Sequence, residues 1–204
     1  MLVTRIESVT KTKFKVYVDE QFAFVLYKGE LSRYRIEEGV ELSHDLLEEV
    51  KTKVVLKRAK LRAMHLLNAM ERTEEQLRLK LKQGLYTEDI IDEALRYVKS
   101  FGYVEDQGYA ERYIRNRQNA KSKRELYAAL CQKGVSREDI QNAMETCYEE
   151  ADELDAIRRI VEKKRFSVED STDVEKKRIF DYLLRKGFRR EDIVKVIQVS
   201  CWNA

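Results

Sequence analysis

Three adjacent Glu-Asp pairs could support chemistry, because two neighbouring carboxyl groups can divide the roles of general acid and general base. They are Glu88-Asp89, Glu138-Asp139 and Glu191-Asp192. Each pair stands in the same seven-residue frame, Gly-x-x-x-Glu-Asp-Ile, and the frames begin at Gly84, Gly134 and Gly187. We expect each pair to occupy the first turn of a helix, where negative charge is favourable beside the helix dipole. The pairs therefore indicate repeated helix starts and not a catalytic centre.

The histidines and cysteines form no pattern typical of a catalytic or metal site. His44 and His65 are 21 residues apart, and no ligand-like group accompanies either one. The sequence contains neither a G-x-x-x-x-G-K phosphate loop nor a G-x-G-x-x-G motif. Cys131, Cys147 and Cys201 are an odd number in separate segments, as expected for reduced thiols in a cytoplasmic protein. We therefore predict a protein that is not an enzyme, with no catalytic residue, cofactor or metal site.

The repeated frame predicts a tandem array, since its glycines are 50 and 53 residues apart. A repeat that cannot bury its own apolar face must stack on a neighbour, and stacking creates a long surface suited to a long partner. Helices are favoured because the 204 residues include no proline and only seven glycines. No apolar run of about 18 residues is present, so we expect no membrane span.

The helices of the array have sequence-level start and stop signals. Capping boxes are predicted at Thr73–Gln76, Ser122–Glu125 and Thr172–Glu175. In a capping box, a hydroxyl side chain and an acid or amide side chain three residues later each accept a hydrogen bond from the other's backbone amide. The helices that follow should end near Gly84, Gly134 and Gly187, each in a left-handed conformation. Second helices should begin near Thr87, Ser136 and Arg189, and third helices should cover about 106–120 and 150–165. The second helices should bury Ile90, Ala94 and Val98; Ile140, Met144 and Tyr148; and Ile193, Ile197 and Cys201.

The N-terminal residues have a different pattern. Residues 14–18 alternate between apolar and polar types, and a second β-rich run follows at 22–26, which predicts a hairpin paired with a third strand near Val3–Val9. Ser43 is a plausible cap for helical sequence over about 44–70. The predicted fold is mainly α, an elongated tandem array of three three-helix repeats after a small β-hairpin region. Its divisions are 1–43, the hairpin region; 44–120, the lead helix and first repeat; 121–170, the second repeat; and 171–204, the third.

Charge is segregated along the chain, although the formal net charge is only +3. Basic residues concentrate in 51–62, 111–124 and 158–165, whereas 138–155 holds eight acids and no base. Such segregation can steer a partner and fix its register, or it can reflect ordinary solvated helix faces. Tyr109 and Tyr113 could form a base-stacking platform, but packing between helices is the favoured interpretation. The candidate partner-binding residues are Arg112, Arg115, Arg117, Lys121, Lys123, Arg124, Arg158, Arg159, Lys163 and Lys164.

Two segments resemble a known family. Residues 101–117, Phe-Gly-Tyr-Val-Glu-Asp-Gln-Gly-Tyr-Ala-Glu-Arg-Tyr-Ile-Arg-Asn-Arg, are similar to the signature of the RecX family, regulators of the RecA recombinase. Residues 177–188, Lys-Arg-Ile-Phe-Asp-Tyr-Leu-Leu-Arg-Lys-Gly-Phe, are similar to a second family motif. Gln107-Gly108 departs from the family's usual charged pair. The resemblance covers about residues 57–197, and its motifs fall in the family's order and spacing.

The resemblance implies a cytoplasmic, non-enzymatic regulator in DNA recombination, repair and the SOS response. Family members are arrays of three three-helix units that bind in the groove of RecA–DNA filaments. They inhibit ATP hydrolysis, strand exchange and co-protease activity, or block filament growth. The partner expected here is therefore the RecA filament on DNA, bound by a monomer and compatible with weak direct DNA contact. The alternative is a helical module that binds nucleic acid by itself, which the basic helices favour and the near-neutral total charge disfavours as a sole function.

Overall fold

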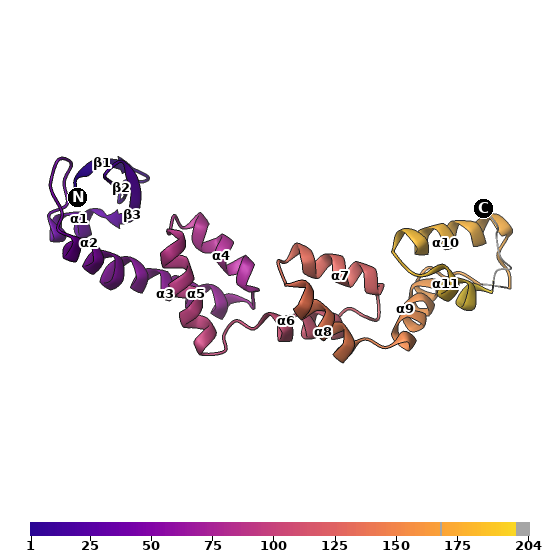
Figure 1. Ribbon diagram of the computed structural model, residues 1–204. Coiled ribbons are helices and arrows are strands. Elements are labelled where there is room, and N and C mark those ends of the chain that lie inside the picture. The colour runs from indigo at the N-terminus through magenta and orange to yellow at the C-terminus, as the bar shows by residue number, and fades with distance from the viewer. Residues whose placement is uncertain (168, 199–204) are drawn as a thin grey trace. The chain divides into compact units, whose positions relative to one another are not determined.

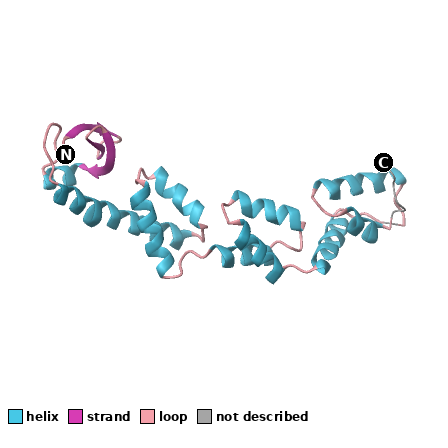
Figure 2. Ribbon diagram, viewed as in Figure 1, coloured by secondary structure: helices cyan, strands magenta, loops and turns pink. Residues whose placement is uncertain are grey.

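The computed structural model describes residues 1–167 and 169–198, apart from the side chains of residues 150 and 151. The chain forms two compact units, Met1–Glu105 and Asp106–Ala204. Helices predominate in the described parts of both units, and the strands belong to the first (Figure 2). The predicted mainly helical fold with a small N-terminal sheet is therefore confirmed.

Unit 1 begins with an antiparallel sheet of strands β1 (Val3–Ser8), β2 (Lys13–Val18) and β3 (Gln21–Tyr27), paired in chain order. The predicted third strand is thus present. Val16, Phe24 and Leu26 are fully or almost fully buried. The turn between β2 and β3 places Asp19 and Glu20 at φ of 47° and 66°. Two left-handed residues match the twist of a hairpin, so this turn forms without the favoured Asn-Gly pair.

The helical sequence predicted over 44–70 is continuous in the structure. After α1 (Lys28–Tyr34), α2 (His44–Val50) runs through the π-helical segment η1 (Lys51–Leu56) into α3 (Lys57–Ala69) (Figure 1). The Ser43 hydroxyl accepts a hydrogen bond from the amide of Leu46 and caps α2, as predicted. The Thr52 hydroxyl donates to the carbonyl oxygen of Glu48 at 2.6 Å, a contact that perturbs regular helix geometry at the start of η1.

Helices α4 (Glu74–Gln83) and α5 (Glu88–Ser100) complete unit 1. The capping box of Thr73 and Gln76 forms in both directions. The prediction of a left-handed Gly84 is wrong, because its φ is −78° and Leu85 takes the left-handed position at 62°. The cause is helix length: α4 continues to the residue before Gly84, so the position after the cap falls on Leu85.

Unit 2 contains α6 (Asp106–Arg115), α7 (Lys123–Gln132), α8 (Arg137–Cys147), α9 (Glu150–Lys163), α10 (Asp173–Arg185) and α11 (Arg190–Ile197). Helices α7 and α10 end two residues before Gly134 and Gly187, which have φ of 81° and 86°. The left-handed prediction is confirmed for both glycines. Helix α6 ends earlier than the predicted residue 120, and α9 ends near the predicted 165.

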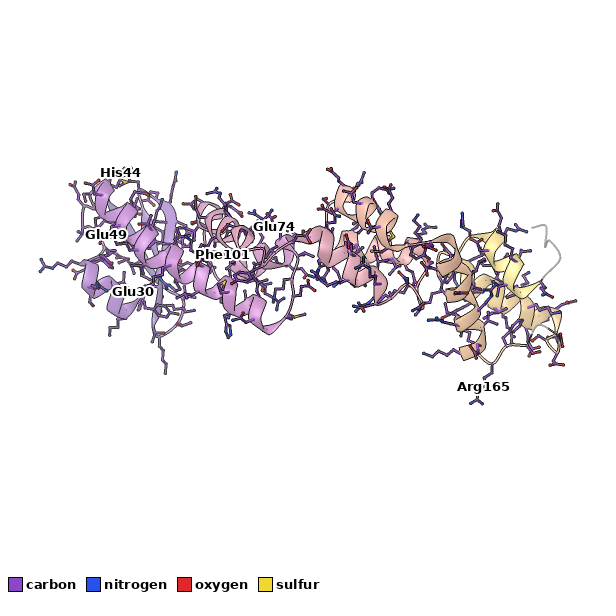
Figure 3. The ribbon with its side chains drawn as sticks, turned by 90° about the horizontal axis from the view of Figure 1, so that it is seen from below. Glu30, His44, Glu49, Glu74, Phe101 and Arg165 are labelled. Atoms are coloured by element: carbon purple, nitrogen blue, oxygen red, sulfur yellow. The ribbon has the colours of Figure 1, made fainter. Side chains whose placement is uncertain are left out.

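Two apolar cores hold unit 2 together. One joins α6, α7 and α8 around Ile114, Leu126 and Ile140, and the other joins α9, α10 and α11 around Ile157, Leu183 and Ile193. Each of these side chains contributes roughly 1.5–3 kcal/mol when fully buried. The predicted buried positions of the second helices are confirmed at Ile90, Ala94, Val98, Ile140, Met144, Ile193 and Ile197. Tyr148 is only partly buried, and Cys201 lies outside the described residues. Many side chains that end in nitrogen or oxygen atoms project outward from the described helices (Figure 3).

Candidate partner-binding surface and cleft of unit 2

The predicted basic residues lie on the surface of unit 2. Lys121 is partly buried. The other nine are exposed: Arg112, Arg115, Arg117, Lys123, Arg124, Arg158, Arg159, Lys163 and Lys164. Two of them pair with an acid of their own helix: Arg115 with Glu111 at 3.2 Å and Arg158 with Asp155 at 2.8 Å. Exposed pairs of this kind add little stability, so their charges remain accessible to a partner.

Aromatic rings support other basic side chains of the set. The guanidinium of Arg117 lies 4.2 Å from the ring centre of Tyr113, and the ammonium of Lys164 lies 4.1 Å from that of Tyr182. A cation over an aromatic face keeps its charge while its side chain is positioned. Tyr109 and Tyr113 themselves are partly buried against the core of α6, α7 and α8, with ring centres 6.4 Å apart. Packing between helices, the favoured interpretation, therefore describes their contacts.

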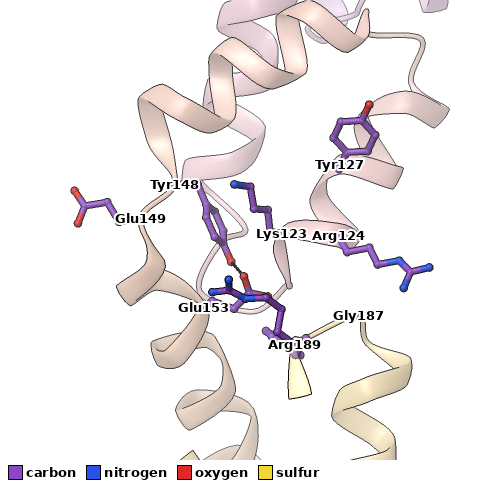
Figure 4. Close-up of a pocket in the computed structure, with 9 residues that line it drawn as sticks. Lys123, Arg124, Tyr127, Tyr148, Glu149, Glu153, Gly187 and Arg189 are labelled. Atoms are coloured by element: carbon purple, nitrogen blue, oxygen red, sulfur yellow. Dashed lines mark hydrogen bonds between the residues drawn. The ribbon is translucent and has the colours of Figure 1, made fainter. Parts of the chain in front are cut away.

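A cleft of about 580 Å³ brings two of the predicted residues together with residues of later helices. Lys123, Arg124 and Tyr127 come from α7, and Tyr148, Glu149 and Glu153 come from the end of α8 and the start of α9 (Figure 4). The third wall is Gly187–Arg189, before α11. The remaining predicted basic residues do not line this cleft.

The walls of the cleft are joined at the start of α7. The fully buried Ser122 donates its hydroxyl to the carbonyl oxygen of Lys186 at 2.6 Å, and the ammonium of Lys186 pairs with Glu125 at 3.1 Å. Ser122 also accepts from the amide of Glu125 at 3.1 Å. The predicted capping box of Ser122 and Glu125 is therefore only half formed, because the Glu125 carboxylate pairs with Lys186 and does not bond the backbone amide of Ser122. The box of Thr172 and Glu175 forms completely.

A buried carboxyl group lies at the bottom of the cleft. Glu153 is only 4% exposed, and the hydroxyl of Tyr148 donates to it at 3.4 Å (Figure 4). Burial raises the pKa of Glu153, the positive charge of Arg189 opposes that rise, and the negative charge of Asp192 adds to it. Burial, followed by the charge of Glu153, also raises the pKa of Tyr148. The carboxylate of Asp192 is itself paired with Arg189 at 2.7 Å and Lys195 at 3.5 Å. The bottom of the cleft is thus a network of interacting polar and charged groups from the end of α8, from α9 and from α11 with the residue before it.

Glu153→Gln is expected to stabilise unit 2 at neutral pH. The folded-state pKa of Glu153 lies above its unfolded value, so ionisation weakens the folded state once the pH exceeds the unfolded pKa of about 4.5. Removing the ionisable group should raise the melting temperature at pH 7, and the gain should disappear near pH 4. Thermal melts across this range measure the effect, with Glu162→Gln, at an exposed position of the same helix, as control. A loss of stability at pH 7 would show that the attraction of the Arg189 charge for the Glu153 carboxylate outweighs the cost of burial.

The sequence does not indicate that Tyr148, Glu153 and Arg189 are neighbours. Its patterns predict a core position at Tyr148 and a helix start at Arg189. Their association depends on how successive repeats stack, which no local pattern specifies. Among residues 1–167 and 169–198, no group of three or more His, Cys, Asp or Glu could hold a metal ion. No described helix is both long and apolar enough to cross a membrane.

The fold and these surfaces define a class of protein, in which three-helix repeats with exposed basic helices follow a small antiparallel sheet. Family models for the first, second and third three-helix domains of RecX match residues 59–97, 106–144 and 150–197. A curated relative, the Regulatory protein RecX of Caldanaerobacter subterraneus subsp. tengcongensis, is 33% identical over 98% of this chain and 100% of its own. This chain belongs to the RecX family.

Other relatives agree with this assignment. The Regulatory protein RecX of Clostridium acetobutylicum is 26% identical over 96% of this chain and 94% of its own. A crystal structure described as regulatory protein RecX superposes with a TM-score of 0.65 at 22% identity, covering 97% of this chain and 98% of the other. The crystal structure of RecX from Lactobacillus salivarius superposes with a TM-score of 0.59 at 23% identity. The match covers 70% of this chain and 94% of the other. The two solved structures support the fold.

Proposed function

We propose that this chain regulates the RecA recombinase, mainly as an inhibitor, by binding in the groove of the RecA–DNA filament. Membership of the RecX family supports a regulatory role. The observation that carries the binding proposal is the exposure of nine of the ten predicted basic side chains on the helices and loops of unit 2. Exposed bases distributed over successive repeats can contact an acidic surface that a filament presents repeatedly.

The proposed mechanism is restraint of the filament. A regulator that contacts neighbouring RecA protomers gains avidity over one with a single contact. If the bridged arrangement fits one conformation of the filament better than others, binding shifts the population towards that conformation. ATP hydrolysis needs movements between protomers, so we expect this restraint to lower the hydrolysis rate; strand exchange and co-protease activity are expected to fall as well. In this role the chain acts as a monomer in the cytoplasm, and it is not an enzyme and uses no cofactor.

Adding this protein to RecA filaments on single-stranded DNA is expected to lower the rate of ATP hydrolysis in a concentration-dependent way. The same mixture should show this protein sedimenting with the filaments. Electron microscopy of the filaments distinguishes density along the groove from density only at filament ends. An unchanged hydrolysis rate at excess protein would contradict the proposed function, and density confined to ends would contradict groove binding.

The second candidate is a helical module that binds nucleic acid by itself. The exposed bases of α6, α7 and α9 favour it, because Lys and Arg neutralise phosphates. Titration of bare DNA at two salt concentrations discriminates between the candidates. Tight, steeply salt-dependent binding with no effect on RecA would favour the second. The net charge of only +3 favours weak DNA contact beside filament binding.

A further inference from the structure

Unit 1 contains a cationic pocket that the candidate surface of unit 2 does not include. Its volume is about 680 Å³. It lies where the start of β2 and the end of β3 meet α3, α4 and the connection to α5. The lining residues, called here the unit-1 pocket, are Lys13, Tyr27, Arg58, Leu61, Arg62, His65, Lys80, Gln83, Gly84 and Tyr86. Four of them are lysines or arginines, and none is a carboxylic acid.

Arg58 is the fixed element of the unit-1 pocket. Its guanidinium donates to the Val25 carbonyl at 3.3 Å and to the Glu30 carboxylate at 3.2 Å, and it lies 4.8 Å from the ring centre of Tyr27. Glu30, labelled in Figure 3, is held in turn by the backbone amide of Tyr27 at 2.7 Å. The Nε atom of Arg58 is buried and has no hydrogen-bond partner among the described residues. The protein thus orients this guanidinium without satisfying it completely.

The other cations of the unit-1 pocket are less compensated. The ammonium of Lys13 lies 5.4 Å from the Tyr27 ring centre, and Lys80 bonds the Gln83 amide oxygen at 3.2 Å. Arg62 is exposed, and neither it nor Lys13 or Lys80 forms an ion pair within 4 Å in the described part of the chain. The Glu30 carboxylate pairs with Arg58 and offsets one of the four positive charges of the pocket. Like charges held around one opening repel, and an anion relieves that repulsion.

We propose that the unit-1 pocket binds the phosphate backbone of single-stranded nucleic acid. Arginine matches the geometry of a phosphate through its forked donors, and lysines add charge around it. Tyr27 and Tyr86 lie in the same walls, and aromatic rings among cations are typical of surfaces that bind single strands. An acidic peptide is a poorer fit, because peptide sites usually offer apolar anchor pockets. Here Leu61 is the one aliphatic lining residue, and it is 63% exposed.

This inference assigns the weak DNA contact considered above to the unit-1 pocket. It rests on the proposed function only for that DNA contact. Arg62 and Lys80 reach the pocket from α3 and α4, far from the bases of α6, α7 and α9 in the sequence. Direct strand contact from unit 1 would let the chain recognise the DNA of a filament as well as its protein.

Arg62→Ala with Lys80→Ala in the full chain tests the unit-1 pocket. Both side chains are exposed, so folding should be unaffected. At about 0.15 M salt, where screening acts over roughly 8 Å, affinity for a 30-nucleotide oligo(dT) should fall about tenfold. The slope of log affinity against log salt should decrease in magnitude by about 1.4, the value for two single-strand phosphate contacts. The control is Lys28→Ala with Lys57→Ala, which removes the same charge from exposed positions of unit 1 outside the lining.

Three outcomes would overturn the inference. Equal losses in both double variants would show that net charge, not the pocket, governs binding. Unchanged oligo(dT) affinity in the pocket variant would exclude the pocket as a strand site. Normal oligo(dT) binding with reduced binding to RecA protein in the absence of DNA would indicate an acidic protein partner instead. RecA inhibition is measured in a separate assay. If the proposed function fails, the parent protein and the variants all leave the hydrolysis rate unchanged. If the pocket proposal fails, the change appears in the oligo(dT) measurements.

Discussion

Replacing Arg112, Arg115 and Arg117 together by glutamate is expected to impair inhibition of RecA ATP hydrolysis while the helical circular-dichroism signal stays intact. All three side chains are exposed, at the end of α6 or just after it. Their reversal changes six units of charge on one small surface, which converts attraction for an acidic partner into repulsion. The concentration required for half-maximal inhibition should rise roughly tenfold or more, chiefly through slower association.

The control for this variant reverses three exposed bases of the same unit that lie outside the predicted set, Arg137, Lys177 and Arg185. Both variants have the same net charge, so a difference between them assigns the effect to position. Reversal of Arg115 also places two acids four residues apart with Glu111, which weakens α6 by a few tenths of a kcal/mol. Substitution of the three arginines by glutamine avoids that cost. Full inhibition by both the glutamate and glutamine variants would remove this helix from the binding surface.

The helical architecture could be predicted because its signals are local. Ser43, Thr73 and Thr172 cap the helices that the sequence predicts after them, and the glycines at 134 and 187 have the expected left-handed conformation. Gly84 shows the limit of such reasoning. Its frame is the same as the other two, but α4 extends one residue further, so Leu85 takes the left-handed position. A repeated motif therefore predicts that a helix ends, but the residue at which it ends depends on packing.

The candidate site could be predicted only in part. Exposure of the basic residues follows from their density in short segments, which cannot all be buried. Their role in binding RecA stays a prediction. The cleft of unit 2 and the unit-1 pocket could not be found in the same way, because each combines distant segments. Lys13 and Lys80 share a pocket although 67 positions separate them, and Ser122 bonds the carbonyl of Lys186 across 64 positions. Such pairings depend on tertiary packing, which no sequence spacing in this chain specifies.

Gly187→Ala is expected to destabilise unit 2 by about 2–5 kcal/mol. A left-handed conformation costs an L-residue about 1–2 kcal/mol, and overpacking adds about 1–3 kcal/mol. Gly187 has φ of 86°, and an added Cβ atom would lie 3.1 Å from both the Arg124 Cβ and the Ser122 Oγ. Ser122 cannot move aside without losing its hydrogen bond to Lys186. The substitution should therefore separate the walls of the cleft as well as strain the turn.

Gly39→Ala separates these two causes. Gly39 has nearly the same φ, 82°, but an added Cβ there would meet no heavy atom within 4 Å. Gly39→Ala should therefore destabilise unit 1 by only about 1–2 kcal/mol, the cost of the left-handed backbone conformation. Hydrogen exchange measured peptide by peptide reports the opening free energy of each region. In Gly187→Ala the loss should appear in α7 and α10 together, because the Ser122–Lys186 contact joins them. If the two glycine variants lost equal stability, or if α7 kept its protection in Gly187→Ala, the close contact at the cleft would not contribute to the stability of unit 2.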